Sequence, residues 1–316
     1  MNARPDLSVI VVNWNVRDLL RDCLASVRNQ STLAPECYEV IVVDNASHDG
    51  SAAMVREEFP DILLISNATN VGFGAANNQG YLIARGRFVL LLNPDTLMLP
   101  GAMDTLLSRI EERRDAAVIG SRLLNRDRSL QKWTGGSFPT LWNIATHYLF
   151  LDLLLPAGLR PKPLYLVEDL AVETPVDWVS GACLILRREA LGERIFDPAF
   201  FMYGEDMELC HRVKAAGHEV LYCPEATIIH FQGESMKQQQ GDILLSSLKG
   251  PRQFFQLTRS ATDVRIMDIL TLAGFGLRAL LYLAASLAKR KSAMRDKARS
   301  SYQYFCIALK LMRSAP

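Results

Sequence analysis

The stretch FVLLLNPDTLMLPGAM, from Phe88 to Met103, changes from an apolar run to a polar turn within three residues. Its five leading apolar side chains predict a strand that is covered on both faces of a sheet. The run breaks at Asn93-Pro94-Asp95, and a helical pattern follows Pro100. Because proline lacks an N–H and fixes its own φ, it stiffens this turn and holds the Asp95 carboxylate at the end of the strand.

The same strand belongs to a regular alternation of short apolar runs and helical patterns. Strands are expected at Ser8–Asn13, Tyr38–Asp44, Ile62–Ser66 and Arg87–Asn93, and helices at Arg17–Asn29, Gly50–Glu58 and Gly74–Ala84. This alternation predicts an α/β fold with a mostly parallel sheet and helices on both faces. Farther along, a helix is expected at about Glu205–Ala216 and strands near Glu219–Cys223 and Thr227–His230.

Polar side chains follow each of the first four expected strands. They are Asn13, Asn15, Asp44, Asn45, Asn67, Asn70, Asn93 and Asp95. In open parallel sheets, ligands bind beyond the carboxyl ends of the strands. One Asp after a strand is ordinary turn chemistry, but a row of polar side chains along one edge predicts a ligand site.

Composition and cysteine spacing limit both the partners and the cellular compartment of the protein. Lys+Arg 35 against Asp+Glu 34 gives no global field that would attract nucleic acid. The six cysteines form no C-x-x-C pair, which is typical of reduced thiols in a cytosolic protein. The opening MNARPDLSVIVV passes directly into a strand without the apolar core of a signal peptide, so we expect the catalytic part in the cytoplasm.

Familiar phosphate-binding motifs are missing. The turn after the first strand, NWNVRDLL, has no G-x-G-x-x-G, and the chain has no G-x-x-x-x-G-K-[ST], which disfavours dinucleotide oxidoreductases and P-loop enzymes. In NATNVGFGAANNQG, Asn67 to Gly80, glycines lead into a helix N-terminus and let backbone N–H groups approach a phosphate. The alternative for this segment is a loop with good helix-capping residues.

Three further side chains are candidates for chemistry. Asp95 can hold a hard divalent cation, because such ions take oxygen ligands and keep waters and substrate phosphates as well. Glu205 and Asp206 open a helix directly after Gly204, where complementing the helix dipole is the alternative role. His230 closes an expected strand, where a packed or surface histidine is the alternative.

Seven segments together carry a resemblance to a known family. They are SVIVVNWN, VIVVDNASHDGS, NVGFGAANNQG, FVLLLNPD, VSGACLILRR, FMYGEDMELCHR and HFQGES. In this order they resemble the inverting family 2 glycosyltransferases of GT-A fold, and most closely the bacterial rhamnosyltransferase-like branch. The resemblance runs from about Leu7 to Ser235 and implies a catalytic GT-A domain over residues 1–240. The donor-binding half would lie at about 1–120 and the acceptor and catalytic half at about 121–240.

The resemblance also implies roles for residues at the donor side. Asp44 resembles the acid that holds the nucleotide base or ribose. The other residues implied near the donor are Asn13, Asn15, Asn70, Gly72, Asn77 and Asn93.

For the metal and the base, the resemblance implies three residues. Asn93-Pro94-Asp95 stands where the family has Asp-x-Asp, with Asp95 as the retained metal carboxylate and Asn93 in place of the first acid. His230 resembles the histidine that completes a site for Mg²⁺ or Mn²⁺. Asp206, in Gly-Glu-Asp, resembles the general base.

The function implied is metal-dependent, inverting transfer of a sugar from a nucleoside-diphosphate donor. dTDP-rhamnose is favoured first and UDP-hexoses next, and the expected acceptor is a hydroxyl of a glycan or a polyprenyl-diphosphate-linked glycan in cell-surface polysaccharide synthesis. Two alternatives stay open. A non-catalytic nucleotide-sugar binding module is disfavoured by the intact Asp95, Asp206 and His230. A sugar nucleotidyltransferase is disfavoured because the first strand lacks a glycine-rich turn with Arg and Lys.

The C-terminal region, residues 241–316, is expected to be helical, first apolar and then basic. Ile269–Ala288 is long enough to span a bilayer. Arg278 falls near its middle, where it would cost roughly 2.5–3.5 kcal/mol on the insertion scale. An interfacial helix, or one packed against LWNIATHYLFLDLLLP, avoids that cost. With the basic residues of Lys289–Arg299 facing anionic headgroups, we expect peripheral attachment to the inner face of the cell membrane. The alternative is an ordinary buried C-terminal helix with a solvated basic end.

Overall fold

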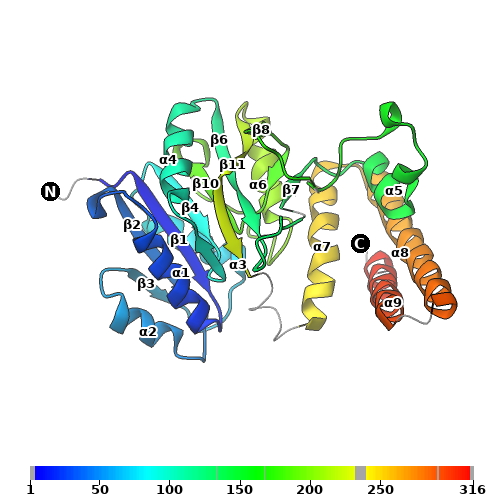
Figure 1. The fold of residues 1–316 in the computed structure, drawn as a ribbon, viewed down its shortest axis with the longest axis horizontal. Helices are drawn as coiled ribbons and strands as arrows, with labels where there is room; N and C mark the ends of the chain where they lie inside the picture. The colour runs from blue at the N-terminus through cyan, green and yellow to red at the C-terminus, as the bar shows by residue number, and fades with distance from the viewer. Residues whose placement is uncertain (1–3, 133, 167, 232–239, 290–291, 314–316) are drawn as a thin grey trace. The chain divides into compact units, whose positions relative to one another are not determined.

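The computed structural model describes residues 4–132, 134–166, 168–231, 240–289 and 292–313 (Figure 1). By contacts the chain divides into two compact units. The first, here the sheet unit, comprises Met1–Gly136 and Tyr165–Gln238, and the second, the helical unit, comprises Ser137–Leu164 and Gln239–Pro316. Residues 137–164, which the sequence analysis includes in the catalytic region, therefore make their contacts with the C-terminal helices.

A mixed sheet forms the sheet unit, and in the described residues it has nine strands in the order β3-β2-β1-β4-β10-β6-β11-β5, with β8 on β11. Their bounds are β1 Leu7–Asn13, β2 Tyr38–Asp44, β3 Leu63–Ser66, β4 Phe88–Leu92, β5 Thr96–Met98, β6 Ala116–Leu124, β8 Thr174–Pro175, β10 Cys183–Arg187 and β11 Glu219–His230. Strands β3, β2, β1 and β4 are parallel, as are β6 and β11, whereas β10 is antiparallel to both of its neighbours. The mostly parallel sheet is confirmed. A separate pair joins β7 Gly135–Gly136 to β9 Trp178–Val179.

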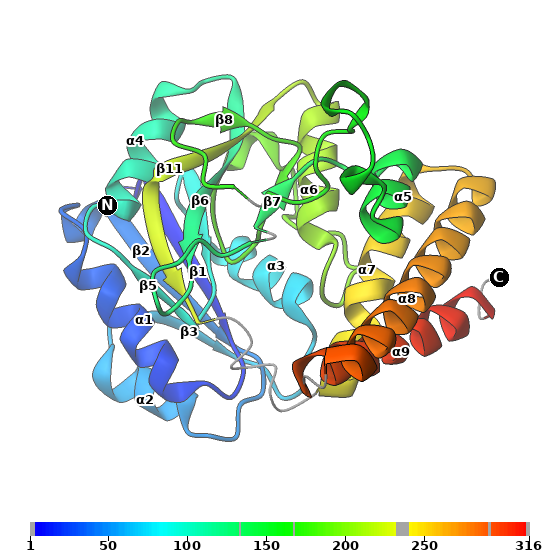
Figure 2. The ribbon, with the colours of Figure 1, turned by 45° about the vertical axis from the view of Figure 1, so that its right-hand side comes forward.

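Helices cover both faces of the sheet (Figure 2). On one side lie α1 Arg17–Asn29, α2 Ser51–Glu58 and α4 Ala102–Glu112, and on the other α3 Phe73–Ile83 and α6 Glu205–Ala215. Alternate residues of β1 point to opposite faces, so Val9 packs in the core under α1 and α4 while Ile10 faces α3. A Cβ on Gly80 would lie 2.7 Å from Ile10 Cγ2, so the glycine allows α3 to approach the sheet closely.

The later strands of the sheet differ in part from the sequence expectation. The strands expected near Glu219–Cys223 and Thr227–His230 form one strand, β11, with a register shift against β6 between Cys223 and Thr227. The bulge keeps pairing on both sides of Pro224, which has no N–H to donate. The short β5 was not expected, because three residues after a proline turn carry too little pattern to predict a strand.

The helical unit contains α5 Leu141–Leu149, α7 Gln240–Thr258, α8 Ala261–Lys289 and α9 Ser292–Arg313, with short 3-10 turns at Leu151–Leu153 and Ala157–Leu159. Helix α5 begins with a capping box, because the Thr140 side chain accepts from the Asn143 N–H and the Asn143 side chain accepts from the Thr140 N–H. Ile144 of α5 packs with Phe255, Val264 and Met267 in a small core.

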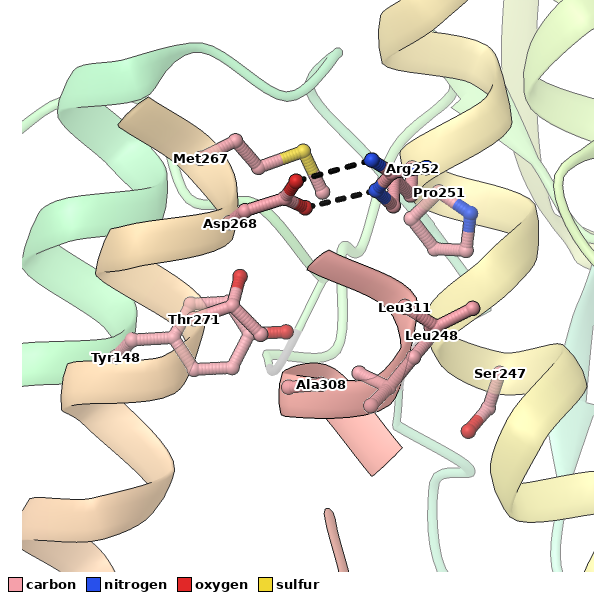
Figure 3. Close-up of a pocket in the computed structure, with 10 residues that line it drawn as sticks. All are labelled: Tyr148, Ser247, Leu248, Pro251, Arg252, Met267, Asp268, Thr271, Ala308 and Leu311. Atoms are coloured by element: carbon pink, nitrogen blue, oxygen red, sulfur yellow. Dashed lines mark hydrogen bonds and ion pairs between the residues drawn. The ribbon is translucent and has the colours of Figure 1, made fainter. Parts of the chain in front are cut away.

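A buried ion pair joins α7 to α8 beside a small cavity (Figure 3). Arg252 Nε and Nη2 donate to the two carboxylate oxygens of Asp268 at 2.8 and 3.0 Å. Figure 3 shows the guanidinium and carboxylate facing one another, with Thr271 and Tyr148 on the same side of the cavity as Asp268. Since each charge satisfies the other, the pair serves packing within the helical unit.

Arg278, the charge in the middle of the apolar stretch, packs against α5. Its Nη2 donates to the His147 carbonyl at 2.6 Å, near the C-terminus of α5. The guanidinium also lies over the rings of Tyr148 and Phe150, at 5.3 and 4.8 Å from their centroids. This is the packing against LWNIATHYLFLDLLLP that the sequence analysis left open. Within the described residues, α8 is the one helix long and apolar enough to cross a membrane by length and composition.

Candidate active site

The sheet brings Asp95 and His230 together at one edge. Strand β5 runs antiparallel to the end of β11, with Thr96 opposite His230, and the Phe231 N–H donates to the Asp95 carbonyl at 2.8 Å. This pairing sets His230 Nε2 3.3 Å from Asp95 Oδ1. Both side chains are almost fully buried, so the two atoms face one another in a region of low dielectric. A nitrogen lone pair and a carboxylate oxygen repel each other there unless a cation or a proton lies between them.

Asn93 adds a third polar group to this edge. Its Nδ2 lies 3.5 Å from His230 Nε2, and its buried Oδ1 has no hydrogen-bond partner. A buried amide oxygen without a partner is costly, so such an atom indicates a missing ligand.

These donors fit a divalent cation. Carboxylate and amide oxygens suit Mg²⁺ and Mn²⁺, and a neutral imidazole nitrogen is a common metal ligand. Two ligands at right angles on an ion about 2.1 Å away lie about 3 Å apart, close to the observed separation. No group of three or more His, Cys, Asp or Glu side chains with metal-binding geometry occurs in the part of the chain that the structure describes.

The acidic pair at the start of α6 follows a sharp backbone turn. Tyr203 and Gly204 both have positive φ, at 67° and 90°, and the helix begins at Glu205. Burial raises the pKa of Glu205 to about 8, and the neighbouring Asp206 charge adds to the effect. Burial also raises the pKa of Asp206 to about 6, although the side chain keeps a partly exposed surface. The pKa is raised further for the more deeply buried Glu205, so Asp206 is the acid of the pair that ionises first as the pH rises.

One turn links Asp206 to the strand end that carries Asn93. The Gly181 N–H donates to Asp206 Oδ2 at 3.4 Å, and the next residue, Ala182, accepts from the Asn93 N–H at 2.9 Å. The turn between β9 and β10 thus connects the α6 carboxylate to the end of β4. The candidate base and the candidate metal ligands belong to the same edge of the sheet.

A second polar cluster lies at the ends of β1 and β2. Asn13 Nδ2 donates to Asp44 Oδ1 at 2.9 Å and to Ser47 Oγ at 3.1 Å, and the Ser47 N–H donates to Asp44 Oδ2 at 3.1 Å. Asn15 accepts from the His48 N–H through its side chain. The buried Oδ1 of Asn13 has no partner. This cluster presents a fixed carboxylate and an unsatisfied amide oxygen, which suit the N–H and hydroxyl groups of a nucleoside.

The glycine-containing loop is held by Asn45. Its Nδ2 donates to Asn70 Oδ1 at 2.8 Å, and its Oδ1 accepts from the Val71 N–H at 3.0 Å. Gly72 has a φ of 90°, and a Cβ there would lie 2.7 Å from the Phe201 ring. Gly72 is needed both for its backbone conformation and for the close approach of the segment that leads to Asp206.

Asn77 lies apart from the other candidates. It is buried in α3 and its Nδ2 donates to the Phe73 carbonyl of the same helix, and no hydrogen bond among the described residues joins it to the strand-end clusters. Of the HFQGES segment, residues 232–235 lie outside the described residues.

The sequence analysis assigned no role to two residues that hydrogen-bond to the candidate site residues, Ser47 and Gln131. Gln131 Oε1 lies 2.7 Å from His230 Nδ1. Ser47 lies in the segment VIVVDNASHDGS, where a serine is ordinary turn chemistry. Gln131 lies in the loop SLQKWTGGSFPTLW, whose residue pattern does not indicate which side chain reaches His230.

Comparison with known proteins gives consistent matches. The model of the family described as Glycosyl transferase family 2 matches residues 8–194. The N-acetylglucosaminyl-diphospho-decaprenol L-rhamnosyltransferase of Mycobacterium tuberculosis is 30% identical over 242 residues, which cover 72% of this chain and 77% of that protein. Rhamnosyltransferase WbbL of Escherichia coli is 26% identical over 231 residues, covering 71% of this chain and 82% of that protein.

Solved structures support the fold. The mannosyltransferase PcManGT from Pyrobaculum calidifontis, in complex with GDP-Man and Mn²⁺, gives a TM-score of 0.62 at 18% identity and covers 99% of this chain and 89% of that one. GalNAc-T7 with UDP, GalNAc and Mn²⁺ gives 0.54 at 15% identity, covering 81% of this chain and 50% of that one. The GT-A fold expected from the sequence is confirmed.

Proposed function

Because this chain belongs to glycosyl transferase family 2, we propose that it is a metal-dependent, inverting enzyme that moves a sugar from a nucleoside diphosphate to a hydroxyl group. The observation that carries this proposal is the 3.3 Å approach of His230 Nε2 to Asp95 Oδ1 at the edge where the partly exposed Asp206 also lies. The reaction requires ligands for a cation and, near them, a carboxylate that can act as the base.

Each group has one task. When bound, a divalent cation supplies Lewis acidity that neutralises the leaving diphosphate. Asp95, His230 and Asn93 would hold the cation, and Asp44 with Asn13 would orient the nucleoside. Asp206 accepts the proton of the acceptor hydroxyl as the bond from that oxygen to the anomeric carbon forms and the bond to the diphosphate oxygen breaks. A single base with attack opposite the leaving group inverts the anomeric centre.

The proposed donor is dTDP-rhamnose, with UDP-hexoses second, and the proposed acceptor is a polyprenyl-diphosphate-linked glycan of a cell-surface polysaccharide. The names of the Mycobacterium tuberculosis and Escherichia coli relatives, both rhamnosyltransferases, support this order. The test is a thermal-shift panel of nucleotide sugars with Mn²⁺ or Mg²⁺, followed by release of nucleoside diphosphate from the donor that stabilises most. No stabilisation by any nucleotide sugar, with or without metal, would contradict the proposal.

We also propose that the helical unit binds the cytoplasmic face of the membrane. Most of the exposed large hydrophobic side chains among the described residues lie in this unit, including Trp142, Leu153, Leu154, Leu159, Leu280 and Leu287. Arg295, Lys297 and Arg299 on α9 are exposed as well. Apolar side chains beside basic ones suit an anionic lipid surface, where lipid-linked acceptors are located.

The tethering of Arg278 to α5 favours a peripheral position over a span. A spanning α8 would have to give up the bond to the His147 carbonyl or carry α5 into the bilayer. High salt or carbonate should therefore release the full-length protein from membranes. Extraction by detergent alone would show that α8 spans, and absence from the membrane fraction would contradict attachment.

A further inference from the structure

Gln131 is buried at the end of a tight hairpin that follows β6. Strand β6 ends at Leu124, an antiparallel bridge pairs Leu124 with Leu130, and the Gln131 N–H donates to the Leu123 carbonyl at 2.9 Å. Because β6 lies next to β11 in the sheet, with Leu124 beside Ile229, the hairpin delivers Gln131 to the residue that ends β11, His230. Only 4% of Gln131 is exposed, so its amide is oriented by protein groups.

The hydrogen bonds around Gln131 determine which end of its amide faces His230. Gln131 Nε2 donates to the His230 carbonyl at 3.2 Å and to Asn125 Oδ1 at 3.2 Å. Asn125 is itself oriented, because its Nδ2 donates to Ser129 Oγ and to the Leu130 carbonyl. A backbone carbonyl can only accept, so the Gln131 end that faces it must be the NH₂ group.

The other end of the amide is then an acceptor directed at the imidazole. Gln131 Oε1 lies 2.7 Å from His230 Nδ1, so Nδ1 must carry a proton to make this bond. In the neutral ring the second nitrogen, Nε2, then carries a lone pair, and Nε2 is the atom 3.3 Å from Asp95 Oδ1 and 3.5 Å from Asn93 Nδ2.

We propose that Gln131 is a positioning residue that holds His230 in its Nδ1–H tautomer, so that the Nε2 lone pair is available to the divalent cation. With the opposite tautomer, an Nε2–H group would donate to Asp95 and occupy the place of the cation. The identity of the ligand as a cation rests on the proposed function, whereas the tautomer of His230 is a property of the protein alone.

Two variants separate this role from a purely structural one. Gln131→Met removes the acceptor and both donors, and Gln131→Glu keeps an acceptor for Nδ1–H but loses the same donors. A role limited to anchoring the hairpin would make the two variants equally defective. If the acceptor matters, Gln131→Met should weaken Mn²⁺ binding by about 10- to 100-fold and Gln131→Glu by less than about threefold.

The measurement is a titration of Mn²⁺ alone into the full-length protein, with free Mn²⁺ followed by electron paramagnetic resonance. Gln256→Met, an exposed glutamine of α7, is the control and should bind as the wild type does. Equal losses in both Gln131 variants, or wild-type affinity in Gln131→Met, would overturn the proposal.

A second measurement needs neither metal nor variant. Long-range ¹H–¹⁵N correlation spectra of the metal-free protein at pH 8 should show the His230 ring protonated at Nδ1 alone. A proton on Nε2 would overturn the proposal. If the spectra show the Nδ1–H ring but Mn²⁺ does not bind the wild type, the metal-dependent function fails while the positioning by Gln131 stands.

Discussion

Asp268 of the helical unit and two acids of the sheet unit, Asp95 and Asp206, have different partners. In the helical unit, Asp268 is held by both nitrogens of an Arg252 fork. In the sheet unit, no Lys or Arg among the described residues pairs with Asp95, and Asp206 has only backbone N–H donors. The charge of a buried acid with a cationic partner is compensated within the protein, whereas an acid without such a partner keeps its charge available for a ligand or a proton. The contrast supports the proposal that the chemistry takes place at the sheet edge.

The largest effect should come from removing the base in the sheet unit. Asp206→Asn should lower the rate of sugar transfer by roughly two to four decades, the usual scale of a general base, with donor binding and folding retained. The measurement is the single-turnover transfer rate with saturating donor. Retention of a tenth of the wild-type rate would remove Asp206 from this role.

The same substitution in the helical unit should affect stability instead of rate. Asp268→Asn leaves Arg252 as a buried charge without its partner, which should lower the free energy of unfolding by roughly 3–5 kcal/mol. Replacing both with apolar residues, as in Arg252→Met with Asp268→Leu, should recover much of the loss. Chemical denaturation followed by far-ultraviolet circular dichroism, with kcat measured below the transition, checks both. A loss of kcat in the folded Asp268→Asn variant would break the contrast between the units.

The dependence of kcat on pH should report the ionisation of Asp206. Because burial raises the pKa of Asp206 to about 6 and the base acts when ionised, kcat should fall about tenfold per pH unit below about pH 6 and level off above it. Glu205→Gln keeps the neutral form that Glu205 has at pH 7, so its profile should keep the same lower limb. A limb that moves with Glu205→Gln would assign the titration to the other acid.

Glu205 should also couple stability to pH. Its folded-state pKa of about 8 lies above the ordinary value of 4.5, so its favourable contribution is complete below about pH 4.5 and is lost as the pH rises through about 8. Glu205→Gln removes this dependence. The melting temperature of the wild type should therefore fall relative to that of Glu205→Gln between pH 7 and pH 9, and parallel curves would contradict the assignment.

The sequence was sufficient for strands β1 to β4 and for the polar residues at their ends, because buried parallel strands carry a strong apolar pattern and their ends share one edge. The roles of those polar residues stay predictions. It was not sufficient for Gln131, since a side chain in an irregular loop reaches His230 only through the pairing of β6 with β11. The same limit applied to Arg278, whose partner on α5 is a backbone carbonyl that leaves no trace in residue type. Contacts made by backbone atoms and by loops depend on the tertiary fold.

The smallest effect should come from single apolar side chains on the helical unit. Leu287 and Leu82 are matched in exposure, at 74% and 73%, but lie in α8 and in α3 of the sheet unit. Leu287→Gln should weaken binding to phosphatidylglycerol-containing vesicles about fivefold, since partial burial of one leucine contributes about 1 kcal/mol. Leu82→Gln should leave it unchanged. Equal behaviour of the two variants in a vesicle sedimentation assay would show that the apolar side chains of α8 do not form the lipid-binding surface.

The most direct test of the sheet edge as a metal-assisted transfer site is nucleoside diphosphate release from the stabilising donor, measured against Mn²⁺ concentration. The wild type should require the metal, Asp95→Ala should lose both the rate and the response to Mn²⁺, and His230→Ala should keep a weaker response because it removes a neutral ligand. A wild-type rate and an unchanged Mn²⁺ response in Asp95→Ala would contradict the account.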